Sequence, residues 1–332
     1  MRAATWGVRF VVVAAAAVLA APQAAGAARL LGVTGNAARF ERLTGQHSTV
    51  VQKVVGWGQG DSWGSSFADL FSTMGDVPLL SLTMNGDSGV AVIDSRRIAN
   101  GAGDAYLAKL SRAVGEWARP IYVRPFFEAD AFWSSYCAYT RAGRAKRASV
   151  STAAFRKAFA RTYLILHGGP ATQVNARLRA LRLPPLKVGD LPANPAPRLK
   201  VIWSPQAYAV PELATNQPHR YYPGSAYVDV VGNTIYGEPR IKWLEQEAYY
   251  RRYSRKPFAI AEWALWYRDD PQYIRDMARF ARTHRRLELL VYDNGRPGSL
   301  FDLALRPRSL AAYRSLIVPM GGRGPGQASV RP

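Results

Sequence analysis

The sequence has little cysteine and little histidine. Cys137 is the only cysteine among 332 residues, so no disulfide can form within the chain. The four histidines, His47, His167, His219 and His284, are far apart and show none of the spacings typical of a zinc site. We therefore expect stability to come from a buried core, and we expect the chemistry to need neither a metal nor another cofactor.

Long hydrophobic runs are also missing, except at the N-terminus. The apolar run at residues 10–21 is shorter than the roughly 20 residues that a membrane-spanning helix needs. Arg2 and Arg9 precede it, and the small residues Ala25-Gly26-Ala27 follow, an arrangement typical of a secretory signal peptide. We predict a signal peptide at residues 1–27 and a secreted or periplasmic mature protein that does not insert into the membrane.

Acidic residues are scarce beside basic ones. The chain has 23 Asp and Glu against 44 Lys and Arg, which gives a formal net charge of +21. A field of this sign favours anionic partners such as an acidic polysaccharide, an anionic cell envelope or nucleic acid. No nucleic-acid-binding motif accompanies the charge, and the basic residues are spread along the chain, so we expect no nucleic-acid partner. The alternative interpretation is an arginine-rich but merely solvated surface.

Short apolar or β-branched runs alternate with segments of helical periodicity through most of the chain. Strands that alternate with helices form parallel sheets, and eight repeats suit a closed barrel better than an open sheet. We therefore predict an α/β fold, a single monomeric (β/α)8 TIM barrel over residues 28–320, followed by a disordered tail at 321–332. The predicted strands are residues 30–34, 50–57, 77–84, 121–127, 199–204, 227–235, 257–263 and 287–293.

Two helix starts and two long connections carry specific expectations. Asp104 is predicted to cap a helix, and Asp270 with Pro271 is predicted to begin another. Residues 134–150 follow the fourth strand, so we expect a loop on the catalytic face of the barrel. Residues 168–198 follow the fourth helix and are expected at the opposite end, away from substrate.

Two glutamates lie where predicted strands end. Glu128 ends the run RPFFE after the fourth strand, and Glu262 lies near the end of the seventh in PFAIAEW. Parallel barrels carry their reactive groups at the carboxyl ends of the strands. A carboxylate there is costly to desolvate unless it is paired, hydrogen-bonded or used chemically. A structural salt bridge is the alternative for either glutamate alone, whereas the two together favour a catalytic pair.

The residues around Glu128 carry a resemblance to a known family. The run IYVRPFFEADAFW resembles the acid/base segment of glycoside hydrolase family 26, the β-mannanase and β-1,3-xylanase family in clan A of the (β/α)8 glycosidases. Three further segments are similar in the same order, namely VIWSP, YYPGSAYVDVVGNTIY and KPFAIAEWA, so the resemblance extends over residues 30–316. It implies a retaining hydrolase in which Glu128 is the acid/base and Glu262 the nucleophile.

Aromatic residues at strand ends give candidate substrate contacts. Tyr236 matches the family tyrosine that hydrogen-bonds the nucleophile, Trp133 the tryptophan beyond the acid, and Trp203 the tryptophan of the fifth-strand motif. Trp57 and Trp266 lie near other strand ends, where flat aromatic faces can stack on sugar rings. The alternative for each tryptophan is core packing. The predicted substrate-binding set is Trp133, Tyr236, Trp203, Asp130, Trp266 and Trp57.

Three positions depart from the family pattern. Phe127 stands where mannanases have histidine immediately before the acid, Asp130 stands where asparagine is common, and Gln206 replaces an asparagine after the fifth-strand proline. On a strand of period two, Arg124 is expected to point to the opposite face from the acid. Asp229 and Asp293 also lie on late strands, where either could be a structural acid of the barrel, and both are left outside the predicted site.

Three functions fit these patterns. The leading hypothesis is a secreted, endo-acting hydrolase of a β-linked polysaccharide such as mannan. A second is an inactive barrel that binds a glycan without cleaving it, because Phe127 cannot donate the hydrogen bond of a histidine. A third, which joins the positive charge to the fold, is an enzyme that processes an anionic exopolysaccharide. All three have a polysaccharide as partner, and the third adds an anionic glycan or the cell envelope.

Overall fold

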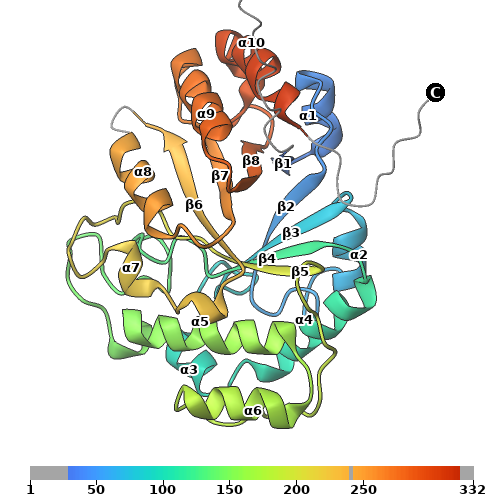
Figure 1. Cartoon of the computed structure of the whole chain (residues 1–332), viewed down its shortest axis with the longest axis vertical. Helices are drawn as coiled ribbons and strands as arrows, with labels where there is room; N and C mark the ends of the chain where they lie inside the picture. The colour runs from blue at the N-terminus through green and yellow to red at the C-terminus, as the bar shows by residue number, and fades with distance from the viewer. Residues whose placement is uncertain (1–28, 239–241, 322–332) are drawn as a thin grey trace, which may run out of the picture.

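The protein forms a closed barrel of eight parallel strands in the order β1 to β8 (Figure 1). The computed structural model describes residues 29–238 and 242–321, so the predicted signal peptide and almost all of the predicted tail lie outside the described residues. The single (β/α)8 barrel predicted from the sequence is confirmed. Its strands are β1 (Leu30–Gly35), β2 (Val50–Val55), β3 (Val77–Leu82), β4 (Ile121–Pro125), β5 (Leu199–Trp203), β6 (Val230–Gly237), β7 (Phe258–Leu265) and β8 (Leu287–Gly295).

Helices connect the strands and surround the barrel, which gives each strand a covered outer face (Figure 1). They are α1 (Ala37–Thr44), α2 (Phe67–Ser72), α3 (Ser95–Ala99), α4 (Asp104–Trp117), α5 (Thr152–His167), α6 (Ala171–Ala180), α7 (Pro218–Tyr221), α8 (Trp243–Arg252), α9 (Pro271–Thr283) and α10 (Pro307–Leu316). No helix in the described part of the chain is long and apolar enough to cross a membrane.

The interior of the barrel changes from apolar to polar along its axis. Val50 of β2 and Leu289 of β8 belong to one buried apolar cluster near the amino ends of the strands. Because side chains alternate along a strand, residues two or four positions later point the same way. Those residues are Gln52 and Asp293, so polar groups occupy the interior toward the carboxyl ends. Apolar side chains also fill the layer between the outer face of the barrel and the surrounding helices.

The fourth strand is shorter than predicted, and this shapes the site. β4 ends at Pro125 rather than residue 127, because Phe126 has a φ of 53° and Glu128 a φ of 54°. Left-handed backbone is costly for side chains with a Cβ, and such conformations concentrate at functional positions. The chain therefore leaves the sheet at Phe126, and Glu128 follows on a tight turn whose backbone N–H donates to Ser204 O at 2.8 Å.

Of the two predicted helix caps, one is confirmed and one is wrong. The Asp270 side chain accepts hydrogen bonds from the backbone N–H groups of Gln272 and Tyr273 at the start of α9. Asp104 is instead the first residue of α4, with Gly103 as the cap. Its carboxylate binds the buried Arg161 guanidinium at 2.6 and 2.7 Å, and a carboxylate so engaged cannot cap its own helix.

Residues 168–198 form the long connection between α5 and β5, and part of it packs beside α5. It begins with α6, which lies on the outer side of α5 in Figure 1. Backbone hydrogen bonds in both directions between Gly169 and Leu191 close its base. None of its residues lines the site cavity described below.

Candidate active site

A cavity of about 500 Å³ opens at the carboxyl ends of the strands and holds both predicted catalytic glutamates. Parallel barrels place their reactive groups at this end, so the position agrees with the fold. The residues that line it are Glu128, Trp133, Gln206, Tyr208, Val210, Tyr236, Glu238, Glu262 and Trp266. These include five of the eight residues that the sequence pattern assigns to catalysis or substrate binding.

Glu128 is buried, and neutral hydrogen-bond donors hold its carboxyl group. The Trp133 indole Nε1 donates to Oε2 at 2.6 Å, and the Gln206 amide Nε2 donates to Oε1 at 2.9 Å. Burial and the negative charge of Glu262 raise the pKa of Glu128 to about 7. The side chain can therefore carry a proton near neutral pH, as a general acid requires.

Glu262 has the opposite surroundings, because a cation and a phenol bind it. The Arg124 guanidinium donates from Nη1 to Oε2 at 2.7 Å, and the Tyr236 hydroxyl donates to Oε1 at 2.5 Å. The amide of Gln52 adds a longer hydrogen bond to Oε2 at 3.3 Å. The ion pair and the phenol hydrogen bond fix the Glu262 side chain in the cavity and stabilise negative charge on its oxygens.

A β-bulge directs Glu262 inward. The register of β7 against β8 shifts between Ile260 and Trp263, and that of β6 against β7 shifts between Asn233 and Thr234. Ala259 and Ala261 face the barrel interior, so without the bulge strict alternation would put Glu262 on the helix-facing side and Trp263 inside, whereas Trp263 packs in the outer apolar cluster. Bulges of this kind re-aim side chains beside active sites.

Asp293 extends the site although the sequence analysis left it out. Its Oδ2 lies 3.2 Å from the Tyr236 hydroxyl, so this tyrosine links Asp293 to Glu262. Burial and the charge of Glu262 raise the pKa of Asp293 to about 7. The sequence analysis left Asp293 outside the site, whereas its carboxyl group contacts the tyrosine that binds the predicted nucleophile.

The expected orientation of Arg124 is also wrong. Arg124 lies four positions before Glu128, and its side chain is fully buried inside the barrel rather than among the helices. Nη1 binds Glu262 and Nη2 donates to Thr234 Oγ1 at 2.6 Å. The guanidinium carbon also lies 4.5 Å from the centre of the Phe127 ring, so the phenylalanine packs against the cation that holds Glu262.

Three of the predicted substrate contacts do not reach the cavity. Trp203 is 1% exposed and packs outside the barrel against Tyr222 and Tyr253, because it follows the inward-facing Ile202. Asp130 is fully buried behind the wall, where its carboxylate accepts the backbone N–H of Gln206. These two placements correct the sequence prediction, since neither side chain is accessible to a substrate.

Trp57 is the third residue that the cavity does not include. It is half-buried and packs on Tyr106 and Phe126, with ring centroids 4.8 and 6.4 Å away. The core-packing alternative therefore describes it better than sugar binding. By contrast, Trp133, Tyr236 and Trp266 line the cavity, and the Trp133 side chain remains 51% exposed, which leaves its face open to a ligand.

Several lining residues carried no signal in the sequence. Tyr208, Val210 and Glu238 lie in loops beyond β5 and β6, where no period indicates which side chain faces the cavity. Gln206 was noted only as a departure from the family pattern, yet its amide holds Glu128. Among the described residues, no group of three or more His, Cys, Asp or Glu side chains is arranged to hold a metal ion.

Solved structures of similar fold include three from glycoside hydrolase family 26 or mannanases. The Bacillus subtilis mannanase BCman is 17% identical with a TM-score of 0.54, over 88% of this chain and 86% of its own. GH26A from a Muricauda species is 14% identical with a TM-score of 0.54, over 87% and 90%. A GH26 β-mannanase from Bacteroides ovatus is 17% identical with a TM-score of 0.52, over 88% of both chains.

Sequence comparisons add nothing to this structural likeness. No protein-family model matches the chain, and no curated protein sequence matches it. At identities of 13–17%, the structural similarity shows a shared fold. What the protein does must therefore be argued from its own cavity.

Proposed function

We propose that this protein is a retaining glycoside hydrolase that cleaves internal bonds of a β-linked polysaccharide. The observation that carries the proposal is the contrast between two glutamates in one cavity. Burial and the nearby charge raise the pKa of Glu128 to about 7, so it can carry a proton near neutral pH, whereas a guanidinium and a phenol hydrogen-bond to Glu262. Two carboxyl groups whose environments favour opposite protonation states divide the roles of acid and nucleophile between them.

In the first step, a carboxylate oxygen of Glu262 attacks the anomeric carbon. The bond from that carbon to the glycosidic oxygen breaks, and Glu128 gives its proton to the departing oxygen. This leaves a glycosyl ester on Glu262 and a negative charge on Glu128. The Trp133 and Gln206 donors on Glu128 then hydrogen-bond to a carboxylate rather than an acid, which stabilises the charge that has formed.

In the second step, water replaces the leaving group. Glu128 takes a proton from the water, the oxygen attacks the anomeric carbon, and Glu262 departs as a carboxylate. Arg124 and Tyr236 receive that returning charge through hydrogen bonds that are already in place. Two inversions at one carbon give net retention of configuration.

The cavity favours an uncharged glycan, and β-mannan is the substrate we propose. Trp133 and Trp266 offer flat aromatic surfaces beside the two glutamates. Three carboxyl-bearing residues line the cavity, while the described lining includes no Lys or Arg. A uronic-acid polymer would meet the like charge of Glu238 and Glu262 there. Solved structures of similar fold are named as β-mannanases, which supports a mannan-like backbone.

A glycan-binding protein without turnover is the second candidate. The observation that favours it is Phe127, which stacks on Arg124 and offers no hydrogen bond where the family pattern has histidine. Gln206 and Trp133 nevertheless supply two donors to the Glu128 carboxyl group. These contacts favour the enzyme over the binding protein.

The test is a hydrolysis screen across galactomannan, xylan, mixed-linkage glucan and an acidic exopolysaccharide, with new reducing ends as the measurement. We expect cleavage of mannan, roughly 10²–10⁴-fold slower for Glu128→Gln and at background for Glu262→Ala. Glu41→Gln, which removes a surface carboxylate, is the matched control. Retention on mannan without cleavage of any polymer would favour the second candidate, and full activity of Glu262→Ala would refute the mechanism.

A further inference from the structure

Two basic segments lie at the end of the barrel opposite the cavity. Residues 251–256 read Arg-Arg-Tyr-Ser-Arg-Lys, and residues 282–286 read Arg-Thr-His-Arg-Arg. Together the two segments hold seven Lys and Arg and no Asp or Glu. They lead from α8 into β7 and from α9 into β8. Connections that enter parallel strands lie at the amino ends of those strands, away from the catalytic face.

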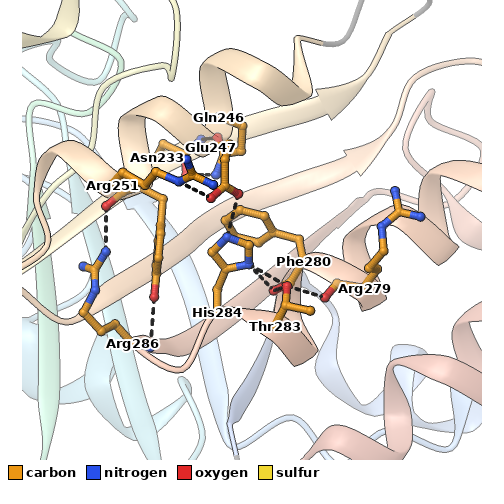
Figure 2. A network of polar contacts seen from close by, with 10 residues as sticks. Asn233, Gln246, Glu247, Arg251, Arg279, Phe280, Thr283, His284 and Arg286 are labelled. Atoms are coloured by element: carbon orange, nitrogen blue, oxygen red, sulfur yellow. Dashed lines mark hydrogen bonds and ion pairs between the residues drawn. The ribbon is translucent and has the colours of Figure 1, made fainter.

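Contacts between the two segments hold them side by side. Arg286 donates from Nη1 to the carbonyl oxygens of Tyr253 and Lys256 at 3.0 and 2.6 Å, and from Nη2 to that of Tyr250 at 2.6 Å. His284 binds Glu247 of α8 at 2.7 Å, as Figure 2 shows. The backbone N–H of Phe258 donates to Arg286 O at 2.8 Å. The cations therefore sit on a preorganised surface.

Four arginines of this surface are exposed and lack an acidic partner. Arg252, Arg255, Arg282 and Arg285 make no salt bridge with any described residue. We call these four residues the basic patch. The carbonyl end of a helix attracts cations, which accounts for Arg252 and Arg282 in the last turns of α8 and α9. It does not account for Arg255 and Arg285, which lie beyond the helix ends.

A depression of about 370 Å³ adjoins the patch. Aromatic rings, hydroxyl groups and cations share its wall, which is formed by Tyr222, Ser225, Arg252, Tyr253, Ser254, Arg255 and Lys256. The Tyr253 hydroxyl is buried, and the Arg252 guanidinium interacts with it from the wall of the depression. The volume falls within the range of about 300–1,000 Å³ for small-ligand pockets.

We propose that the basic patch and its depression bind an acidic polysaccharide through the carboxylates of its sugars. Arg252 and Arg255 supply the charge, Ser225 and Ser254 can hydrogen-bond sugar hydroxyls, and the Tyr222 ring offers an apolar face. A nucleic acid or an anionic lipid surface would meet the same cations, so the experiment below compares both with the polysaccharide. The patch therefore attaches the protein to an anionic glycan without engaging the catalytic cavity.

The carboxylates of the catalytic cavity support this division. Glu238 and Glu262 line it, and no Lys or Arg is among its described lining residues, so an acidic chain is repelled where bonds would be cut and attracted on the opposite face. In this proposal the positive charge attaches the protein to an anionic glycan and does not select the substrate of the catalytic cavity. This inference does not depend on the proposed hydrolase activity, because the binding surface and the cavity share no lining residue.

The experiment is a calorimetric titration of the full mature chain with polygalacturonate at about 50 mM NaCl, where surface charges interact beyond about 10 Å. We expect Arg252→Gln/Arg255→Gln/Arg285→Gln to weaken binding about tenfold, since each exposed contact contributes a factor of roughly two to three. A second variant, Ser254→Glu, puts a carboxylate into the depression and is expected to weaken binding several-fold.

The matched control is Arg96→Gln/Arg112→Gln/Arg179→Gln, which removes the same charge from three exposed arginines on α3, α4 and α6. We expect it to change binding by less than about twofold, because dispersed charges are screened. Equal loss in both triple variants would overturn the proposal. So would loss of duplex DNA or anionic vesicle binding that exceeds the loss for polygalacturonate, since the patch would then serve another partner.

Discussion

Glu128 and Glu262 are chemically identical side chains that their neighbours make different. Neutral donors and burial surround Glu128, whereas a guanidinium and a phenol bind Glu262. The difference comes from residues distant in sequence, since Arg124 lies 138 positions before Glu262. At the scale of residues, the hydrogen-bond partners of each carboxyl group therefore determine which glutamate is suited to which role.

The raised pKa of Glu128 predicts how activity depends on pH. Because the acid must be protonated, and its pKa is raised to about 7, kcat/KM should fall as pH rises through about 7. Glu128→Gln should abolish this fall of kcat/KM at alkaline pH, which we call the alkaline limb of the pH profile. Its residual activity can be followed with an activated aryl glycoside. Asp293 also has a pKa of about 7, so Asp293→Asn is the control and should keep the limb. An unchanged limb in Glu128→Gln would assign it to another group.

Arg124 should support both activity and stability. Arg124→Met leaves Glu262 as a largely buried, uncompensated charge, which costs about 3–5 kcal/mol and should lower the melting temperature by roughly 10 °C. Arg124→Met/Glu262→Gln removes both charges and should regain most of that loss. Calorimetry of the single and double variants measures the difference. Equal melting temperatures for the two variants would contradict a charge-balancing role.

The residues missed by the sequence analysis share a physical cause. Gln52 and Asp293 occupy inward rows that begin with apolar residues, so neither stands out in a local window. Their contacts with Glu262 and Tyr236 cross the barrel interior, and period-two patterns carry no information on cross-barrel distance. The glutamates were found because strand ends are visible in the sequence and two of them carry the same acid.

At the scale of elements, strand positions were predictable and strand irregularities were not. Alternating apolar runs locate all eight strands to within a few residues. The bulge between Ile260 and Trp263 and the positive φ of Phe126 depend on tertiary contacts and leave no composition signal. These two irregularities place Glu262 and Glu128 in the cavity. Predictions from strand periodicity therefore fail at these two functional positions, as is typical where the backbone departs from regular geometry.

The connection between α9 and β8 should contribute to stability through a single side chain. Arg286 donates three hydrogen bonds to carbonyl oxygens of the preceding connection and stacks on Tyr250 at 3.8 Å. Arg286→Ala should cost roughly 2–4 kcal/mol in the free energy of unfolding, because three carbonyl groups lose their partner. The adjacent, exposed Arg285→Ala should stay within about 0.5 kcal/mol. Chemical denaturation of the two variants measures both losses, and similar values would contradict a stabilising role for the Arg286 hydrogen bonds.

At the scale of the whole molecule, the alternation of strands and helices was enough to predict the barrel. Parallel strands need helical crossovers, and eight of them close on themselves, as the structure confirms. Charge is distributed unevenly over this frame. Carboxylates line the catalytic cavity, and arginines gather at the other end. Composition revealed the excess of positive charge, but only the fold shows where it lies.

The single cysteine leads to a prediction about the entire chain. Cys137 is buried, and burial raises the pKa of its thiol, so the reactive thiolate is disfavoured in the native state. A thiol reagent should label it only at the rate of unfolding, and melting temperatures with and without reductant should agree within error. Rapid labelling of the native protein would show that the region around Cys137 opens far more readily than its packing implies.

The most direct test of the central account is to trap the glycosyl ester. A β-mannobiosyl fluoride with fluorine at C2 of the reacting sugar slows both steps, while the fluoride leaving group restores the first, so the covalent intermediate accumulates. Peptide mass spectrometry then locates the sugar. The account predicts one label per chain, on Glu262, and no label in Glu262→Ala. A label on another residue, or none from an enzyme that hydrolyses mannan, would contradict it.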